Sequence, residues 1–244
     1  TKMIEDGMTF EDALKLAQDN GYAEKDPTAD IEGFDACRKV CILASLAFGK
    51  HVYPNQVRAE GITKITLEDV EYISSAHGVI KLLGQIKKID DDKITAFVSP
   101  AVVFHGSQLA SVNGVFNAIL VRGDAVGDVC FYGAGAGKLP TASAVVADMV
   151  DCAVHVNRRK NFGWGPGSED YVVDEKSALE MPFYVRAKAT ESEAVALFHN
   201  VKFLTRTGQP SDEVAFITDS MTENALDKKL AGINVINKIK VTNY

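Results

Sequence analysis

The sequence predicts an α+β fold, with an antiparallel or mixed sheet covered by helices and then a small ferredoxin-like βαββαβ domain. Segments with a helical apolar period fill the first part of the chain. Extended runs joined by short turns follow, and they pair into two hairpins. Beyond a stretch rich in glycine and proline, the pattern reads strand, helix, strand, strand, helix, strand. We therefore expect a first domain over 1–157, a linker over 158–180 and the small domain over 181–244.

Two early helices are predicted from their caps. A threonine followed three residues later by an aspartate is a capping signal, because each side chain can bond to the other residue's free backbone N–H. A glycine just beyond the last apolar position is a common stop signal. The first helix follows Thr9 and Asp12 and ends before Gly21, and the second follows Thr66 and Asp69 and ends near Gly78.

A longer helix is predicted over residues 34–48, opened by Gly33. One apolar stripe follows the helical period, and further apolar residues make its second half apolar nearly all round. We therefore expect that second half to be buried on all sides. The stripe comprises Phe34, Cys37, Val40, Cys41, Ala44 and Phe48, and the added residues are Ile42, Leu43 and Leu46.

The extended runs come next. Residues 79–89 and 93–104 pair across a turn of three aspartates, Asp90 to Asp92. Residues 115–123 and 127–133 pair across a turn containing Gly and Asp. Pro100 lies inside the second run, and since proline has no N–H, it predicts a bulge or an edge position there. A further helix is expected from Pro140 to about Val156.

The bulk properties limit the function. Acidic residues outnumber basic ones 33 to 26, giving a net charge of −7, which disfavours nucleic acid or an anionic membrane as a partner. No apolar run approaches membrane-spanning length, and the start has no secretory pattern. The four cysteines lack CxxC spacing and the five histidines lack ligand spacing, so no metal site is expected. We expect a soluble, cytoplasmic protein with buried thiols.

An acidic turn precedes the longer helix and forms the candidate site. Asp35 and Lys39 are four residues apart, so both side chains leave the helix from one face. Glu24, Asp26 and Asp30 lie just before them. The group fits a site for a small polar substrate, but it also fits a surface ion pair beside solvated carboxylates. Within the second interpretation, Asp30 caps the helix and Asp35 complements its dipole.

Several sequence blocks resemble the homoserine dehydrogenases. The signature is GYAEKDPTADIEGFDACRK, followed by an apolar helix. EGIT, IKLLG, LASVNGVFNAI and GAGAGKLPTASAVVAD continue the resemblance in the family's order. Together these blocks cover about residues 1 to 156.

The resemblance implies roles for the site residues. It implies that Lys39 is the acid/base residue, assisted by Asp35, and that Glu24, Asp30 and Asp35 bind substrate. Gly21, Gly135 and Gly137 would approach the cofactor. The implied reaction interconverts L-homoserine and L-aspartate 4-semialdehyde with NAD(P), in threonine, methionine and isoleucine biosynthesis, by a homodimer or higher homo-oligomer.

The cofactor itself has no complete site in these residues. GAGAGK has the wrong spacing for a phosphate loop and lacks the third glycine of a dinucleotide fingerprint. The family resemblance implies that NAD(P) is bound mainly by a Rossmann part preceding Thr1, so we expect this chain alone to be inactive. The choice between NAD and NADP stays open.

The C-terminal pattern resembles an ACT regulatory domain, which follows the catalytic part in many homoserine dehydrogenases. Such domains often carry a D-x-P-G turn after their first strand, where this chain has Ala189 to Glu193. That departure puts effector binding in doubt. The alternative function for the whole chain is a non-catalytic dimerisation and amino-acid-sensing module. A strand–GxGxxG–helix encoded upstream of Thr1 would favour the enzyme.

Overall fold

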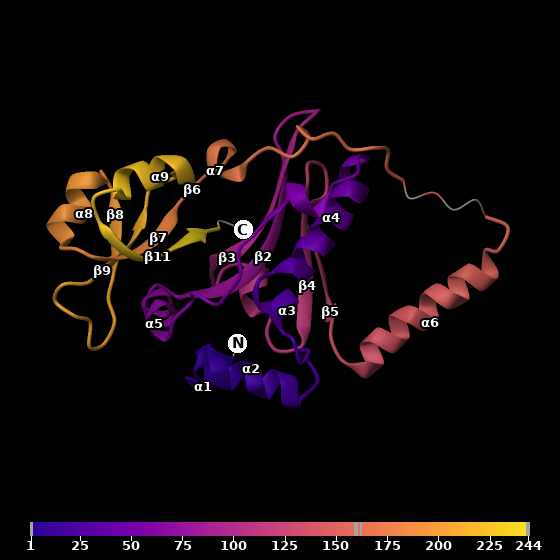
Figure 1. The fold of residues 1–244 in the computed structure, drawn as a ribbon, viewed down its shortest axis with the longest axis horizontal. Coiled ribbons are helices and arrows are strands. Elements are labelled where there is room, and N and C mark those ends of the chain that lie inside the picture. Colours follow the sequence, from indigo (N-terminus) through magenta and orange to yellow (C-terminus); the bar gives the residue numbers. More distant parts are fainter. Residues whose placement is uncertain (1, 159–160, 162, 243–244) are drawn as a thin grey trace.

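The computed structural model describes residues 2–158, 161 and 163–242. Its centre is a mixed seven-stranded sheet, so the predicted α+β class is confirmed (Figure 1). One edge of β3 (Ile94–Phe104) pairs with β2 (Gly78–Lys88), and its other edge pairs with β1 (Arg58–Ala59) and with β11 (Asn234–Val241). Beyond β11 lie β7 (Phe183–Lys188), β9 (Val214–Thr218) and β8 (Val201–Leu204), in that order.

The predicted helix caps are present. Before α2 (Phe10–Asp19), the Thr9 hydroxyl accepts a hydrogen bond from the Asp12 N–H at 3.2 Å. Before α5 (Leu67–Ser75), the Thr66 and Asp69 side chains bond reciprocally to each other's backbone N–H. Two short helices that the pattern does not predict are α1 (Lys2–Asp6) and α3 (Thr28–Ile31).

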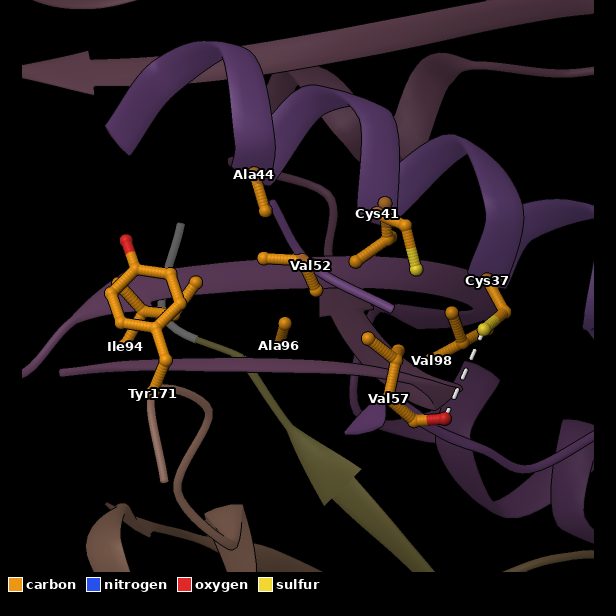
Figure 2. Packing of buried hydrophobic residues seen from close by; sticks show 10 residues of the cluster. Cys37, Cys41, Ala44, Val52, Val57, Ile94, Ala96, Val98 and Tyr171 are labelled. Carbon is orange, nitrogen blue, oxygen red and sulfur yellow. Dashed lines mark hydrogen bonds between the residues drawn. The ribbon is translucent and has the colours of Figure 1, made fainter. Parts of the chain in front are cut away.

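One face of α4 (Phe34–Phe48) packs on β2 and β3, and this contact forms the first core (Figure 2). Gly33 caps the helix with a φ of +77°, and a Cβ there would lie 3.1 Å from Val98 Cγ1. The glycine therefore permits both the left-handed turn and the close start of α4 on β3. The core comprises Cys37, Val40, Cys41, Ala44, Val52, Val57, Ile94, Ala96, Val98 and Tyr171.

The prediction that the second half of α4 is buried all round is wrong. Ile42 is 53% exposed and Leu46 is 54% exposed. A helix lying on a sheet buries only the stripe that faces it, and nothing in the described part of the chain covers the opposite side of α4.

Pro100 occupies neither a bulge nor an edge strand. The β2–β3 register runs unbroken through Pro100, and β3 has partners on both sides. Val98 accepts a hydrogen bond from Glu60 and Val102 accepts one from Thr242, so alternate residues of β3 turn their backbone groups toward β1 and β11. Pro100 falls between these two partners, where its missing N–H breaks no ladder.

The second predicted hairpin is confirmed as a separate two-stranded sheet of β4 (Phe116–Gly123) and β5 (Gly127–Ala134). The helix that follows, α6 (Lys138–Val154), starts two residues earlier than expected and extends away from the body (Figure 1). Its apolar side chains lie largely exposed, including Leu139 at 83% and Met149 at 65%.

The linker between the two predicted domains lies partly against the first of them. Lys50 and Ile94 make isolated bridges with Gly165 and Val172. The linker then enters the short helix α7 (Glu175–Ala178).

The C-terminal part has the predicted βαββαβ order. Its helices are α8 (Glu191–Leu197) and α9 (Glu223–Leu230), and its main strands lie in the order β11, β7, β9, β8. A short strand β6 (Glu180–Met181) pairs with β10 (Met221–Thr222) beside them. Because β11 also runs parallel to β3, this part shares one continuous sheet with the rest of the chain. The domain boundaries stay a prediction.

A buried carboxylate lies where the two parts meet. Glu223, at the start of α9, is 3% exposed and has Lys240 at 2.8 Å, Lys238 at 3.0 Å, Lys176 at 3.3 Å and Arg58 at 3.5 Å. These cations come from β1, α7 and β11, and they hold the pKa of Glu223 far below its ordinary value despite the burial. The cluster therefore ties four elements together through one charge.

A second buried polar network joins α5 to the C-terminal strands. Tyr184 donates to Asp69 at 3.0 Å, and Arg186 binds Glu213 at 3.1 Å. Burial raises the pKa of the Tyr184 hydroxyl. Tyr72 donates to Glu213 at 2.9 Å. Tyr72 and Tyr184 also belong to a second buried apolar cluster, which lies between α5 and the C-terminal strands.

Candidate functional site

The site is centred on the first turn of α4. Lys39 Nζ lies 2.7 Å from Asp35 Oδ2, so the predicted i,i+4 pair forms. The Lys39 side chain is 66% exposed and that of Asp35 44%, so the ammonium group is open to a ligand. An ion pair this exposed adds little to stability.

The acidic turn before α4 is held by its own hydrogen bonds. Asp26 Oδ1 accepts from the Thr28 N–H at 3.1 Å and from the Thr28 hydroxyl at 2.6 Å. These two bonds lower the pKa of Asp26. Gln18 on α2 donates to the Glu24 carbonyl at 3.0 Å. Asp26 therefore fixes the turn that leads into α3.

Glu24 and Asp30 are the two remaining carboxylates of the candidate site. Both side chains are exposed, and in the described part of the chain neither makes a hydrogen bond or an ion pair. The hypothesis that Asp30 caps α4 fails, because only its backbone carbonyl bonds there, to the Gly33 N–H at 3.3 Å. Both carboxylates are therefore free to accept a cationic ligand group.

The EGIT segment, Glu60 to Thr63, packs against this turn and forms hydrogen bonds with it. Ile62 donates its N–H to the Ile31 carbonyl at 2.8 Å, and Thr63 donates its hydroxyl to Glu32 at 3.4 Å. At Gly61, a Cβ would lie 2.2 Å from the Ile31 carbonyl oxygen. A side chain at Gly61 would therefore clash with the end of α3.

The glycine loop, residues 133–137, lies close to the acidic turn at Tyr22. A Cβ on Gly135 would lie 2.0 Å from Asn117 Nδ2, so the amide side chain lies directly over this glycine. Gly137 has a φ of +107°, and a Cβ there would lie 4.0 Å from the Tyr22 ring. The tertiary structure therefore brings Gly137 next to Tyr22, the residue after Gly21.

The arrangement makes two of the expected contacts. Asp35 contacts Lys39, and the glycine loop reaches the acidic turn at Tyr22. Among the described residues, the side chains of Glu24 and Asp30 form no hydrogen bond or ion pair with Lys39 or Asp35. The roles of all these residues stay predictions.

Sequence reasoning did not identify Tyr22, Asn117 or the Asp26–Thr28 hydrogen bonds. The aspartate, proline and threonine at 26–28 carry a signal for these bonds, because an Asp side chain readily accepts from the backbone N–H two residues later. Nothing in the sequence indicates that Asn117 lies over Gly135.

Two thiols lie beneath the site on α4. Cys37 and Cys41 are buried and free, as predicted, and Cys37 donates to the Val57 carbonyl at 3.8 Å (Figure 2). Burial raises the pKa of Cys41 to about 12, so the thiol is inert near neutral pH. In the residues described, no three His, Cys, Asp or Glu side chains are placed to hold a metal ion.

The fold and the site together define the class of protein. It is an α+β protein with an exposed lysine–carboxylate pair at the start of a helix, an acidic turn and a glycine loop beside that turn. A family model described as homoserine dehydrogenase matches residues 1–150. The chain belongs to the homoserine dehydrogenase family.

Individual relatives agree with this assignment. A homoserine dehydrogenase of Pseudomonas aeruginosa is 41% identical over 201 residues, covering 80% of this chain and 46% of the relative. One of Neisseria gonorrhoeae is 35% identical over 98% of this chain and 59% of its own length. A crystal structure of the Thiobacillus denitrificans enzyme matches with a TM-score of 0.82 at 32% identity, over 99% of this chain and 60% of that one.

The chain spans about half the length of the curated relatives that it matches. Among the described residues, no helix is long and apolar enough to cross a membrane.

Proposed function

We propose that this chain carries the substrate-binding and acid/base half of a homoserine dehydrogenase, which interconverts L-homoserine and L-aspartate 4-semialdehyde with NAD(P). The observation that carries the proposal is the Lys39–Asp35 pair at 2.7 Å, exposed beside an acidic turn in a chain of this family. The pathways served would be those to threonine, methionine and isoleucine.

Lys39 would move the proton. A charged ammonium beside the substrate oxygen can donate a proton as the carbonyl is reduced and take it back as the alcohol is oxidised. Asp35 would hold Lys39 in one position, because a carboxylate at 2.7 Å fixes the direction of the ammonium group.

Glu24 and Asp30 would bind the substrate ammonium group. A carboxylate suits this role because a bound ammonium needs charge-assisted hydrogen bonds in exchange for its hydration. Both carboxylates have no partner within the described residues, so a ligand would not have to break an existing pair.

The glycine loop would lie against the nicotinamide. Gly137 has a backbone conformation that favours glycine, and a side chain on Gly135 would clash with Asn117, so glycine at both positions keeps the loop in this conformation. Gly21, adjacent to Tyr22, would lie at the same edge. When bound, the nicotinamide supplies or accepts the hydride. These residues do not favour NAD over NADP.

The proposal includes a homo-oligomer in a reducing compartment such as the cytoplasm. The β4–β5 hairpin exposes Phe131 at 62% and Tyr132 at 56%, apolar area of the kind that subunit contacts bury. The buried free thiols Cys37 and Cys41 suit a reducing compartment.

The second candidate function, a dimerisation and amino-acid-sensing module, is favoured by the βαββαβ order of the C-terminal part. The turn after β7 weakens its sensing role. The Thr190 N–H is already bound to Glu193 Oε2 at 2.8 Å, and this hydrogen bond lowers the pKa of Glu193. That N–H is therefore not free to hold an effector carboxylate.

A chimera tests the proposed function. The part of the Pseudomonas aeruginosa relative that this chain does not match would be fused to residues 1–244. We expect the chimera to reduce L-aspartate 4-semialdehyde with a nicotinamide cofactor and to restore growth of a homoserine-requiring strain. A folded chimera that does neither would contradict the enzyme and favour the regulatory module.

We predict that residues 1–244 by themselves do not oxidise homoserine with NAD or NADP. The reason is that the glycine turn between β5 and α6 lacks the third glycine of a dinucleotide fingerprint, and among the described residues β5 pairs only with β4, in an antiparallel hairpin and not in a βαβ unit. The measurement is the change in nicotinamide absorbance with the purified chain, alongside the chimera as a positive control. Saturable turnover by the chain alone would mean that the cofactor binds within these residues.

In the chimera, Glu24→Ala should raise the KM for homoserine about 10-fold or more while kcat changes less. The lost interaction, a charge-assisted hydrogen bond to the ammonium group, is present in the ground state as well as in the transition state. Glu11→Ala, on the exposed side of α2, is the matched control. A kcat effect larger than the KM effect would place Glu24 in the chemical step.

A further inference from the structure

Lys81 is a lysine on β2 that the proposed function does not use. Leu82 lies near Gly33 and so points toward the α4 side of the sheet. Because side chains alternate along a strand, Lys81 points to the opposite face. It is half-buried there and forms no ion pair in the described part of the chain. Lysine side chains are mostly exposed in proteins, so a half-buried lysine without an ion pair indicates a specific structural role.

The acceptors of Lys81 lie at the base of the β4–β5 hairpin. Its Nζ donates to the Val112 carbonyl and to Asn113 Oδ1, both at 2.6 Å. The Asn113 carbonyl in turn accepts from the Phe116 N–H at 3.2 Å, which starts β4. Burial lowers the pKa of Lys81, and the negative charge of Glu5 on α1 acts against this shift.

Residues near the base of the hairpin contact the glycine loop directly. The Gly135 N–H donates to the Val115 carbonyl at 3.1 Å, two residues beyond Asn113. Asn117 lies over the same glycine. The hairpin forms a sheet of its own, with no strand pairing to the main sheet. Its position relative to α4 therefore depends on contacts at its base.

We propose that Lys81 is a positioning residue, which fixes the base of the hairpin so that the glycine loop lies at the nicotinamide side of the site. We call the contact of Lys81 with Val112 and Asn113 the brace. The catalytic consequence of the brace rests on the proposed function, but the existence of the brace does not. Lys81 touches neither substrate nor cofactor and acts through Asn113 and Val115.

Hydrogen exchange on residues 1–244 tests the brace directly. In Lys81→Met, the Gly135 amide should exchange about tenfold faster or more, the effect of losing hydrogen bonds to a charged group. Asn113→Ala, which removes one acceptor, should give a smaller increase in the same direction, and Lys81→Arg should restore part of the protection. The control is Lys88→Met on the same strand, whose ammonium binds Asp91 in an exposed turn. Unchanged exchange at Gly135 in both Lys81→Met and Asn113→Ala would overturn the brace.

Kinetics of the chimera test the positioning role. Lys81→Met should raise the KM for the nicotinamide cofactor about tenfold, while the KM for homoserine changes less than about threefold. A loss of structure alone would move both constants. Faster exchange at Gly135 with an unchanged cofactor KM would overturn the positioning role. If the chimera with Lys81 intact shows no turnover, the proposed function fails, and exchange at Gly135 still decides the brace.

Discussion

Lys39→Ala should lower kcat of the chimera by about 10²- to 10⁴-fold, the range for a lost general acid. The KM for homoserine should change only modestly, because the proton transfer contributes mainly in the transition state. In this structure the Lys39 ammonium is exposed and held by Asp35 at 2.7 Å, so it can reach a bound substrate oxygen. Steady-state kinetics in both directions measure the effect.

Lys39→Arg separates proton transfer from charge. The guanidinium keeps the positive charge but does not give up a proton at neutral pH. The Arg variant should therefore stay close to the Ala variant in kcat. Lys88→Ala, an exposed lysine on β2, should leave kcat unchanged. Turnover of Lys39→Ala within about threefold of the unchanged chimera would refute the assignment.

Glu223→Gln should lower the free energy of unfolding of residues 1–244 by about 3–5 kcal/mol, because removing one partner leaves buried cations uncompensated. Lys240, itself buried, lies 2.8 Å from Glu223 and is the cation most affected. Urea denaturation at pH 7 measures the difference. Asp227→Asn is the matched control, since Asp227 also binds Lys238 but lies on the exposed side of α9. It should cost less than about 1 kcal/mol.

The effect of Glu223 should depend on pH in one direction. Its folded pKa is far below the ordinary value of 4.5, so its contribution to stability is fully present above about pH 4.5. As the pH falls below 4.5, the unfolded state takes up a proton that the folded state does not, and the contribution declines. The gap between the native chain and Glu223→Gln should therefore narrow below pH 4.5. A gap that widens in acid would show that the carboxyl is protonated in the folded chain.

Local features of this fold could be predicted because each depends on residues close in sequence. The Thr9–Asp12 and Thr66–Asp69 caps, the two hairpins and the βαββαβ order all follow from short-range patterns. The Lys39–Asp35 contact belongs with them, because helical spacing alone places the two side chains together. Family membership also followed from sequence blocks, above all from the signature at 21–39.

The errors have a different origin. The burial of Ile42 and Leu46 and the environment of Pro100 both depend on what lies beside an element, which apolar pattern does not specify. The helical period shows that a side chain is apolar, but not whether a second layer covers it.

The sequence by itself determined the elements, the family and the lysine–carboxylate pair, since each follows from patterns of residues that lie near one another along the chain. Only the tertiary structure decided the rest. It placed β11 beside β3, brought Gly137 to Tyr22 and joined Lys81 to Asn113, pairs separated by 139, 115 and 32 residues. The physical reason is that backbone pairing and van der Waals contact have no sequence signature at such separations. They arise only when the whole sheet closes.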